Sequence, residues 1–146
     1  MSINLLTDIN FFKNNISDII KLYAQLTVMH NITNEQVISF YENRLKSGTY
    51  AYLGVMENDK IVGMVTILFD KKIYRDMQCV GHIEDLVIDK NSRKKGYGNK
   101  LLKIAIELCK HRKCYKIILN CKNQLKKFYE INGFVNNNLC MVMYIK

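Results

Sequence analysis

The chain has 146 residues, of which 49% are hydrophobic and 24% charged, and its formal net charge is +9. The composition excludes a disordered chain, and the length fits one domain, residues 1–146, with a buried core. No apolar run approaches the roughly 20 residues of a membrane-spanning helix, and no signal peptide is visible at the N-terminus, so we expect neither.

The first third of the chain predicts a short strand and two helices. Residues 2–6 could form the strand, and apolar residues at helical spacing predict a helix over 14–26. A second helix is expected to begin at Thr33, because Thr33 and Gln36 fit a capping box. Gly48 is its natural end.

The pattern then changes from helical to extended. Residues 49–56 and 61–69 are rich in β-branched and aromatic side chains, and the polar turn between them predicts a hairpin. Further along we expect a strand at 80–88, a helix at 98–112, a strand at 115–121, a short helix at 125–131 and a last strand at 139–145. The order of all these elements indicates one layered α/β domain.

Positive charge is concentrated in one segment. Between Lys90 and Lys127 there are 13 basic residues and a single acid, Glu107. A local field of this sign favours a polyanionic partner, which could be a nucleotide cofactor, a phosphorylated substrate, a nucleic acid or an anionic membrane.

A glycine-containing turn, residues 93–100, lies between a predicted strand and a predicted helix, with the sequence Arg-Lys-Lys-Gly-Tyr-Gly-Asn-Lys. Glycine lets backbone N–H groups approach an anion, and the helix N-terminus adds unsatisfied donors. The spacing is neither that of a Walker A loop nor that of a dinucleotide fingerprint. A tight turn with solvated lysines is the alternative reading.

The spacing Arg93-x-x-Gly96-x-Gly98 resembles the pyrophosphate loop of the GCN5-related N-acetyltransferase (GNAT) superfamily, and the element order resembles that superfamily over nearly the whole chain. The resemblance implies an α/β fold with a mixed central sheet flanked by helices. It also implies acetyl-CoA as cosubstrate, with its pantetheine arm between the strands at 80–88 and 115–121.

Three blocks narrow the resemblance. Residues 81–88, 114–119 and 128–134 are similar in order and spacing to the glucosamine 6-phosphate N-acetyltransferase family, and residues 26–27 and 31–33 resemble its N-terminal part. The family implies glucosamine 6-phosphate as acceptor, direct transfer in a ternary complex without a metal or an acyl-enzyme, and a product used in UDP-N-acetylglucosamine synthesis. It also implies a homodimer, because its C-terminal lysine often crosses the dimer interface.

The resemblance assigns roles residue by residue. The catalytic residues would be Glu84, Asp85 and Tyr129, with Tyr129 as general acid at the cofactor sulfur. The substrate would be bound by Thr27, Lys72, Tyr74, Arg75, Glu84, Asp85, Tyr115, Lys116, Asn120 and Lys146. The cofactor would be bound by Leu86, Val87, Ile88, Arg93, Lys94, Lys95, Gly96, Tyr97, Gly98, Asn99, Asn123, Phe128 and Tyr129.

Two adjacent acids in an apolar strand are consistent with these roles. Burying Glu84 and Asp85 without a partner is unfavourable, and a cationic amino sugar is such a partner. Their side chains would point to opposite faces of the strand unless a bulge intervenes.

The sequence departs from the family at three positions. Asn120 replaces an acid that is proposed to help deprotonate the amine, and an asparagine cannot take that proton. Catalysis would then depend on one of the strand acids, or on an amine that arrives deprotonated. Lys94 stands where the loop often has glycine, and Leu125 where asparagine is usual, with Asn123 close enough to substitute.

Other readings remain open. The same fold could act on another amine, such as a protein N-terminus or a small amine, although a basic surface would repel polyamines. A nucleic-acid-binding module over residues 90–127 is the weakest reading, because only Tyr97 and Tyr115 interleave with the basic residues. We therefore expect no nucleic-acid partner.

The cysteines suggest neither disulfides nor a metal site. Their number, five, is odd, and no paired C-x-x-C occurs. Cys109 falls on the apolar face of a predicted helix, as buried free cysteines do, which argues against a zinc site with His111 and Cys114. We expect a reduced, cytoplasmic protein that binds no metal.

Overall fold

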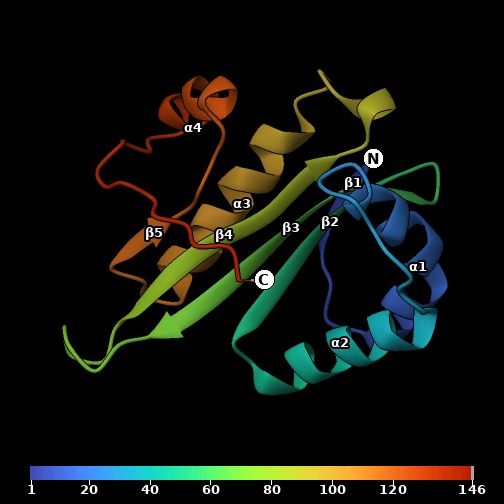
Figure 1. Ribbon diagram of the computed structural model, residues 1–146, viewed down its shortest axis with the longest axis horizontal. Helices are drawn as coiled ribbons and strands as arrows, with labels where there is room; N and C mark the ends of the chain where they lie inside the picture. The colour runs from blue at the N-terminus through green and yellow to red at the C-terminus, as the bar shows by residue number, and fades with distance from the viewer. Residues whose placement is uncertain (146) are drawn as a thin grey trace.

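A five-stranded sheet runs through the middle of the computed structural model, which describes residues 1–145 (Figure 1). The spatial order of the strands is β1-β2-β3-β4-β5; the first four pair antiparallel and β5 pairs parallel to β4. The sheet is therefore mixed, as expected. The strands are β1 (Ser2–Leu5), β2 (Tyr50–Glu57), β3 (Lys60–Lys71), β4 (Cys79–Ile88) and β5 (Lys116–Ile118).

Helices cover both faces of this sheet, because each face presents its own apolar side chains. Phe12, Ile19 and Tyr41 pack with Tyr52 and Met64 on one face. On the other face, Leu101, Leu102 and Ala105 pack against strand residues such as Val65 and Ile67. The helices are α1 (Ile9–Tyr23), α2 (Asn34–Ser47), α3 (Tyr97–His111) and α4 (Lys126–Ile131), with two 3-10 turns, η1 (Lys90–Ser92) and η2 (Asn123–Leu125).

The two parallel strands separate after a short paired stretch. Only Val80, Gly81 and His82 of β4 pair with β5, whereas β4 itself continues to Ile88. β5 is therefore shorter than the strand predicted at 115–121, because the residues that follow Ile118 diverge from β4. A parallel pair that opens in this way leaves backbone groups of β4 available to a ligand.

The helix termini follow the local signals closely at α2 and poorly at α1. Thr33 and Gln36 form the predicted capping box, with bonds of 2.8 and 3.2 Å. Gly48 ends the helix with φ of +67°, a conformation that glycine adopts without steric cost. By contrast, α1 begins five residues before the predicted start, because Asp8 caps it by accepting from the Asn10 N–H.

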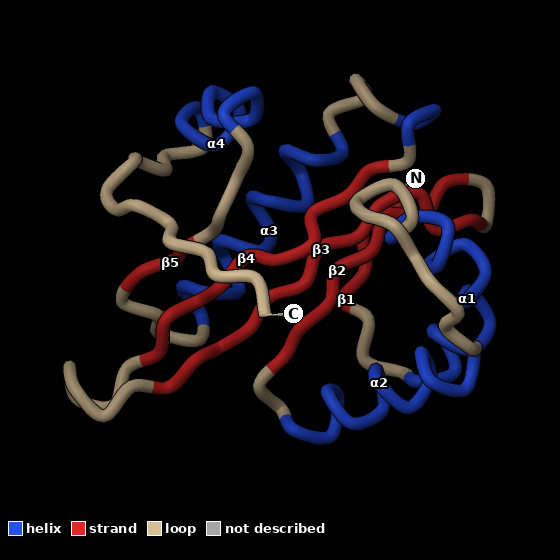
Figure 2. The backbone as a smooth tube through the Cα atoms, viewed as in Figure 1, coloured by secondary structure: helices blue, strands red, loops and turns tan. Residues whose placement is uncertain are grey.

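The predicted last strand, residues 139–145, is wrong. The segment pairs with no strand of the described chain, and a strand exists only when its backbone has a neighbour. Figure 2 shows this part of the chain as a loop that does not join the sheet. Its apolar side chains are left exposed: Leu139, Met141, Val142, Met143, Tyr144 and Ile145.

Among the helices that the structure describes, none has the length and apolar character needed to cross a membrane.

Candidate active site

The middle of β4 carries a β-bulge at the two adjacent acids. Thr66 of β3 pairs with Glu84, but the next pair is Met64 with Val87, so β4 has one residue more than β3 over this stretch. Asp85 takes up the irregularity with φ of +52°. Such a bulge redirects side chains. As a result both acids line one cavity. Without a bulge, adjacent side chains would have pointed to opposite faces of the strand.

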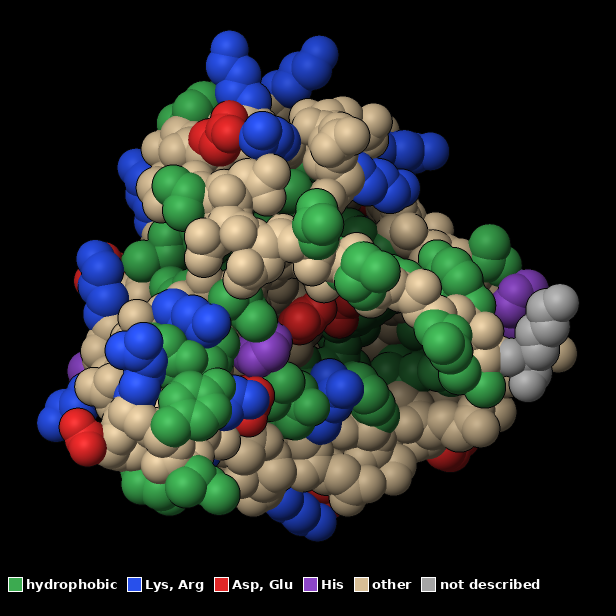
Figure 3. All heavy atoms as spheres, turned by 60° about the vertical axis from the view of Figure 1, so that its left-hand side comes forward, with side chains coloured by type: hydrophobic (Ala, Val, Ile, Leu, Met, Phe, Trp, Pro, Cys, Tyr) green, Lys and Arg blue, Asp and Glu red, His purple; other side chains and the backbone are tan. Residues whose placement is uncertain are grey.

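That cavity, of about 880 Å³, lies where β4 and β5 have separated. Figure 3 shows one face of the molecule hollowed near its centre, with acidic side chains inside the hollow and basic ones both beside it and around the outer edge of the face. The expected site residues that line the cavity are Thr27, Glu84, Asp85, Leu86, Val87, Ile88, Arg93, Lys94, Gly96, Tyr97, Gly98, Asn99, Asn120, Phe128 and Tyr129.

The turn that leads into α3 forms one end of the cavity. Gly96 is the N-cap of α3 with φ of +78°, and no side chain caps the helix, so its first N–H groups remain free of a side-chain acceptor. Lys94 has φ of +63°, a strained conformation for a residue with a Cβ, at the position where the family often has glycine. The Arg93 Nε donates to the Ile88 carbonyl oxygen at 3.1 Å.

Asp85 has the environment of a base. Burial raises the pKa of its carboxyl group, and the Arg44 guanidinium lowers it in part. That guanidinium is fixed between two rings, 4.0 Å from the centroid of Phe40 and 4.2 Å from that of Tyr50. A carboxylate with a raised pKa accepts a proton more readily near neutral pH.

Tyr129 has the environment of an acid. The side chain is buried on α4, and its ring packs edge-on against Phe128 and Phe134. Burial raises its pKa, and the nearby Cys121 thiol raises it further. The phenol is therefore protonated at neutral pH and able to donate.

Two of the expected cofactor ligands lie outside the cavity lining. The Lys95 ammonium pairs instead with Glu57 at the end of β2, 2.9 Å from its Oε1. Asn123 belongs to η2, whose neighbours Gln124 and Leu125 reach the cavity while Asn123 does not.

Five expected substrate ligands form a cluster of their own, away from the cavity lining. The guanidinium carbon of Arg75 lies 4.9 Å from the centroid of the Tyr115 ring, and the Lys116 Nζ lies 5.5 Å from it. The Tyr74 ring meets the same tyrosine edge-on, and Lys72 is bonded to Asp70. Within the described chain the cluster is therefore separate from the two acids of β4.

The remaining expected substrate ligand, Lys146, lies outside the described residues. His82 of β4 does not line the cavity; its Nε2 is 3.5 Å from the Asp70 carboxylate.

The sequence reasoning gave no role to several residues that line the cavity. Gln25 is the clearest, because its amide joins the end of α1 to the end of β4: Nε2 donates to Asp89 at 2.9 Å and Oε1 accepts from the Lys90 N–H at 2.9 Å. A single glutamine 64 residues away from its partner carries no sequence signal. The others are Leu26, Ile83, Ser92, Lys122, Gln124 and Leu125; Cys121 lines the cavity too.

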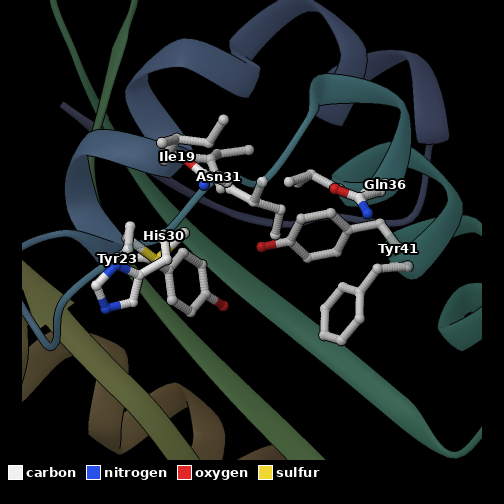
Figure 4. Close-up of a pocket in the computed structure, with 11 residues that line it drawn as sticks. Ile19, Tyr23, His30, Asn31, Gln36 and Tyr41 are labelled. Atoms are coloured by element: carbon white, nitrogen blue, oxygen red, sulfur yellow. The ribbon is translucent and has the colours of Figure 1, made fainter.

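A second cavity, of about 450 Å³, lies between α1 and α2. Figure 4 shows Tyr23 and His30 side by side on one side of it and the Tyr41 hydroxyl pointing inward. Burial raises the pKa of Tyr23 and of Tyr41, and the Asp85 charge contributes to both. Among the described residues no carboxylate lines this cavity, whereas Glu84 and Asp85 line the larger one.

No three potential metal ligands come together in residues 1–145.

The chain belongs to the acetyltransferase (GNAT) family, whose model matches residues 16–134. It is therefore an acyltransferase, and enzymes of this family use acetyl-CoA. Glucosamine 6-phosphate N-acetyltransferase from Arabidopsis thaliana is 34% identical over 128 residues, which cover 86% of each chain. The crystal structure of the Arabidopsis thaliana enzyme superimposes with a TM-score of 0.88 and 30% identity over 100% of both chains.

A further solved structure shares the fold. It is a predicted acetyltransferase from Clostridium acetobutylicum, solved with acetyl-CoA, with a TM-score of 0.77 and 18% identity over 98% of this chain and 96% of that one.

Proposed function

We propose that the chain transfers the acetyl group of acetyl-CoA to the 2-amino group of D-glucosamine 6-phosphate, giving N-acetylglucosamine 6-phosphate for UDP-N-acetylglucosamine synthesis. The observation that carries this proposal is the bulge that turns Glu84 and Asp85 into the cavity that ends at the α3 turn. Acids suit a cationic amine, and the turn suits the phosphates of a nucleotide thioester. The names of the relatives support the amino sugar as acceptor.

The residues at the α3 end of the cavity fit acetyl-CoA. The uncapped N–H groups of α3 and the exposed cations Arg93 and Lys94 would hold its diphosphate. Beyond His82, β4 has no strand partner on the β5 side, so the backbone at residues 86–88 can pair with the amides of pantetheine. When bound, acetyl-CoA supplies an activated acetyl group.

The residues in the middle of the cavity fit direct transfer to an amine. Asp85 would accept a proton from the substrate ammonium, directly or through a water molecule, because burial has raised its pKa. Glu84 would hold the sugar and its amine, and Asn120 can hydrogen-bond the sugar but cannot act as a base. Tyr129 would protonate the departing thiolate. No acyl-enzyme and no metal take part in this scheme.

The residues expected to bind the sugar phosphate support the proposal of a homodimer. The cluster of Tyr74, Arg75, Tyr115 and Lys116 has the charge for a sugar phosphate, yet it does not line the cavity of its own chain. We infer that it completes the cavity of a second copy. The exposed apolar segment 139–145 and the unpaired outer edge of β5 would provide the interface.

A cytoplasmic location is part of the same proposal. All five cysteines are free thiols in the structure, which is the usual state in a reducing compartment.

The test is thiol release from acetyl-CoA by the purified protein. Glucosamine 6-phosphate is compared with glucosamine, glucose 6-phosphate and a short peptide, and turnover only with the phosphorylated amino sugar is expected. Turnover with the peptide alone would keep the fold and overturn the acceptor. CoA binding without turnover on any acceptor would mean that the acid replaced by Asn120 is essential.

A further inference from the structure

Glu57, at the end of β2, accepts hydrogen bonds from three residues that lie between the end of β4 and the first residue of α3, that residue included. Its Oε1 accepts from the Tyr97 hydroxyl at 2.9 Å, and its Oε2 accepts from the Ser92 hydroxyl at 3.0 Å. The Lys95 ammonium bonds to both oxygens, at 2.9 and 3.0 Å. One carboxylate therefore joins the β2–β3 hairpin to a turn that lies 35 to 40 residues further along the chain.

These donors bracket the turn at the cofactor end of the cavity. Ser92 precedes Arg93 and Lys94, and Tyr97 opens α3 directly after Gly96. Two residues between the brackets have left-handed backbones, Lys94 with φ of +63° and Gly96 with φ of +78°, and the first of these is unfavourable for a lysine. Contacts from outside the turn are needed to hold such a conformation, and Glu57 supplies them.

We propose that Glu57 is a positioning residue for acetyl-CoA: it fixes the turn so that the α3 N–H groups and the side chains of Arg93 and Lys94 face the diphosphate. The inference rests on the proposed function, because it concerns the cofactor end of the same cavity. Glu57 itself lines no part of that cavity, so it acts through the turn.

The charge balance agrees with this role. Hydrogen bonds from Lys95, then Tyr97 and Ser92, lower the pKa of Glu57 to about 2, so the carboxylate is ionised throughout the working pH range. An uncompensated carboxylate beside a diphosphate would repel it. The Lys95 ammonium neutralises Glu57, which gives Lys95 a purpose other than contact with phosphate.

The test compares two acetyl donors, acetyl-CoA and acetyl-pantetheine, which lacks the diphosphate. Glu57→Ala should lower kcat/KM for acetyl-CoA on the order of tenfold, the usual effect of losing charged hydrogen bonds, and leave the value for acetyl-pantetheine unchanged. Glu107→Ala is the matched control, because Glu107 pairs with Lys110 on the exposed side of α3. An equal loss with both donors would overturn the inference, since it would indicate general damage to the fold.

Binding of CoA alone, measured by calorimetry, separates this inference from the proposed function. If the wild-type protein acetylates no amino sugar, the proposed function fails, while weaker CoA binding by Glu57→Gln still supports the role of Glu57. If Lys95 instead contacted the diphosphate directly, Glu57→Gln would free its ammonium and strengthen CoA binding. Strengthened or unchanged binding would overturn the inference.

A milder variant covers the case in which Glu57→Ala does not fold. Tyr97→Phe removes only the hydroxyl that donates to Glu57 and keeps the buried ring. We expect CoA binding to weaken about two- to fourfold, as for a single hydrogen bond. Wild-type CoA affinity in a folded Tyr97→Phe protein would contradict the anchoring role.

Discussion

Glu84 and Asp85 are neighbours in one strand, yet their carboxyl groups line the same cavity because Asp85 adopts φ of +52° in a bulge. The two acids differ in environment. Burial raises the pKa of Asp85, which suits its proposed role as the base, whereas the proposed role of Glu84 is to hold the acceptor.

Asp85→Asn should lower kcat by roughly 10²- to 10⁴-fold, the range for loss of a general base. In the wild-type protein kcat/KM should rise with pH as Asp85 ionises, at a pH above the usual range of an aspartate, and then level off. The variant should lose that rise. A pH–rate profile checks this, with Asp18→Asn on the outside of α1 as control. An unchanged profile would assign the base elsewhere.

The same substitution should stabilise the fold at neutral pH. A raised pKa means that ionising Asp85 costs more in the folded state than in the unfolded state. The stability associated with the protonated group is complete below the unfolded pKa and is lost as the pH rises through the folded pKa. Asparagine removes this cost, so the Tm of Asp85→Asn should exceed that of the wild type at pH 7 and not at pH 3.

Tyr129→Phe should lower kcat by roughly 10²-fold with little change in KM for acetyl-CoA, because it removes the proton donor and keeps the ring between Phe128 and Phe134. Steady-state kinetics checks the split between kcat and KM. Thermal unfolding of the variant should match that of the wild type. A full rate in Tyr129→Phe would show that solvent protonates the thiolate.

Asn120→Asp should leave kcat within a few-fold of the wild type, because the proposed base is Asp85 and not the residue at position 120. It adds a carboxylate to the cavity that holds the two acids of β4, and like charges raise one another's pKa values. The acid side of the pH–rate profile should therefore move to higher pH. A large increase in kcat would mean that the wild-type protein lacks a working base.

Cys121 should report whether CoA occupies the cavity. It is exposed and lines the cavity, and Cys140 is exposed outside it, so iodoacetamide should modify both in the free protein. Burial raises the pKa of Cys109 to about 11 and raises that of Cys114 as well, so both should react slowly. Mass spectrometry should find that CoA protects Cys121 and leaves Cys140 reactive. Equal labelling of Cys121 with and without CoA would place the cofactor elsewhere.

The double variant Met141→Asp/Met143→Asp should convert a dimer to a monomer. Both side chains are exposed on the apolar segment 139–145, and a charge at these positions disfavours burial against a second copy. Light scattering after size-exclusion chromatography measures the mass. Lys13→Asp, on the outside of α1, is the control. If the wild-type protein is already a monomer, the proposed completion of the cavity by a partner is excluded.

Local signals in the sequence were sufficient for some features and insufficient for others. The capping box at Thr33 and the end of α2 at Gly48 depend on residues a few positions apart, and both are confirmed. The start of α1 was missed because Asp8 reads equally well as a loop residue. The predicted strand at 139–145 was wrong because apolar composition predicts that a segment will be buried but does not specify which surface it packs against.

By itself, the sequence determined the order of helices and strands as far as α4, the glycine turn before α3 and the pair of acids in β4, since each is encoded by neighbouring residues. Only the tertiary structure decided which residues meet: the bulge depends on the register between β3 and β4, and the cavity on the point where β5 leaves β4. It also paired Lys95 with Glu57 and left the cationic cluster around Tyr115 outside the cavity. Contacts between residues far apart in the chain are set by the packing of the whole domain, which no local pattern specifies.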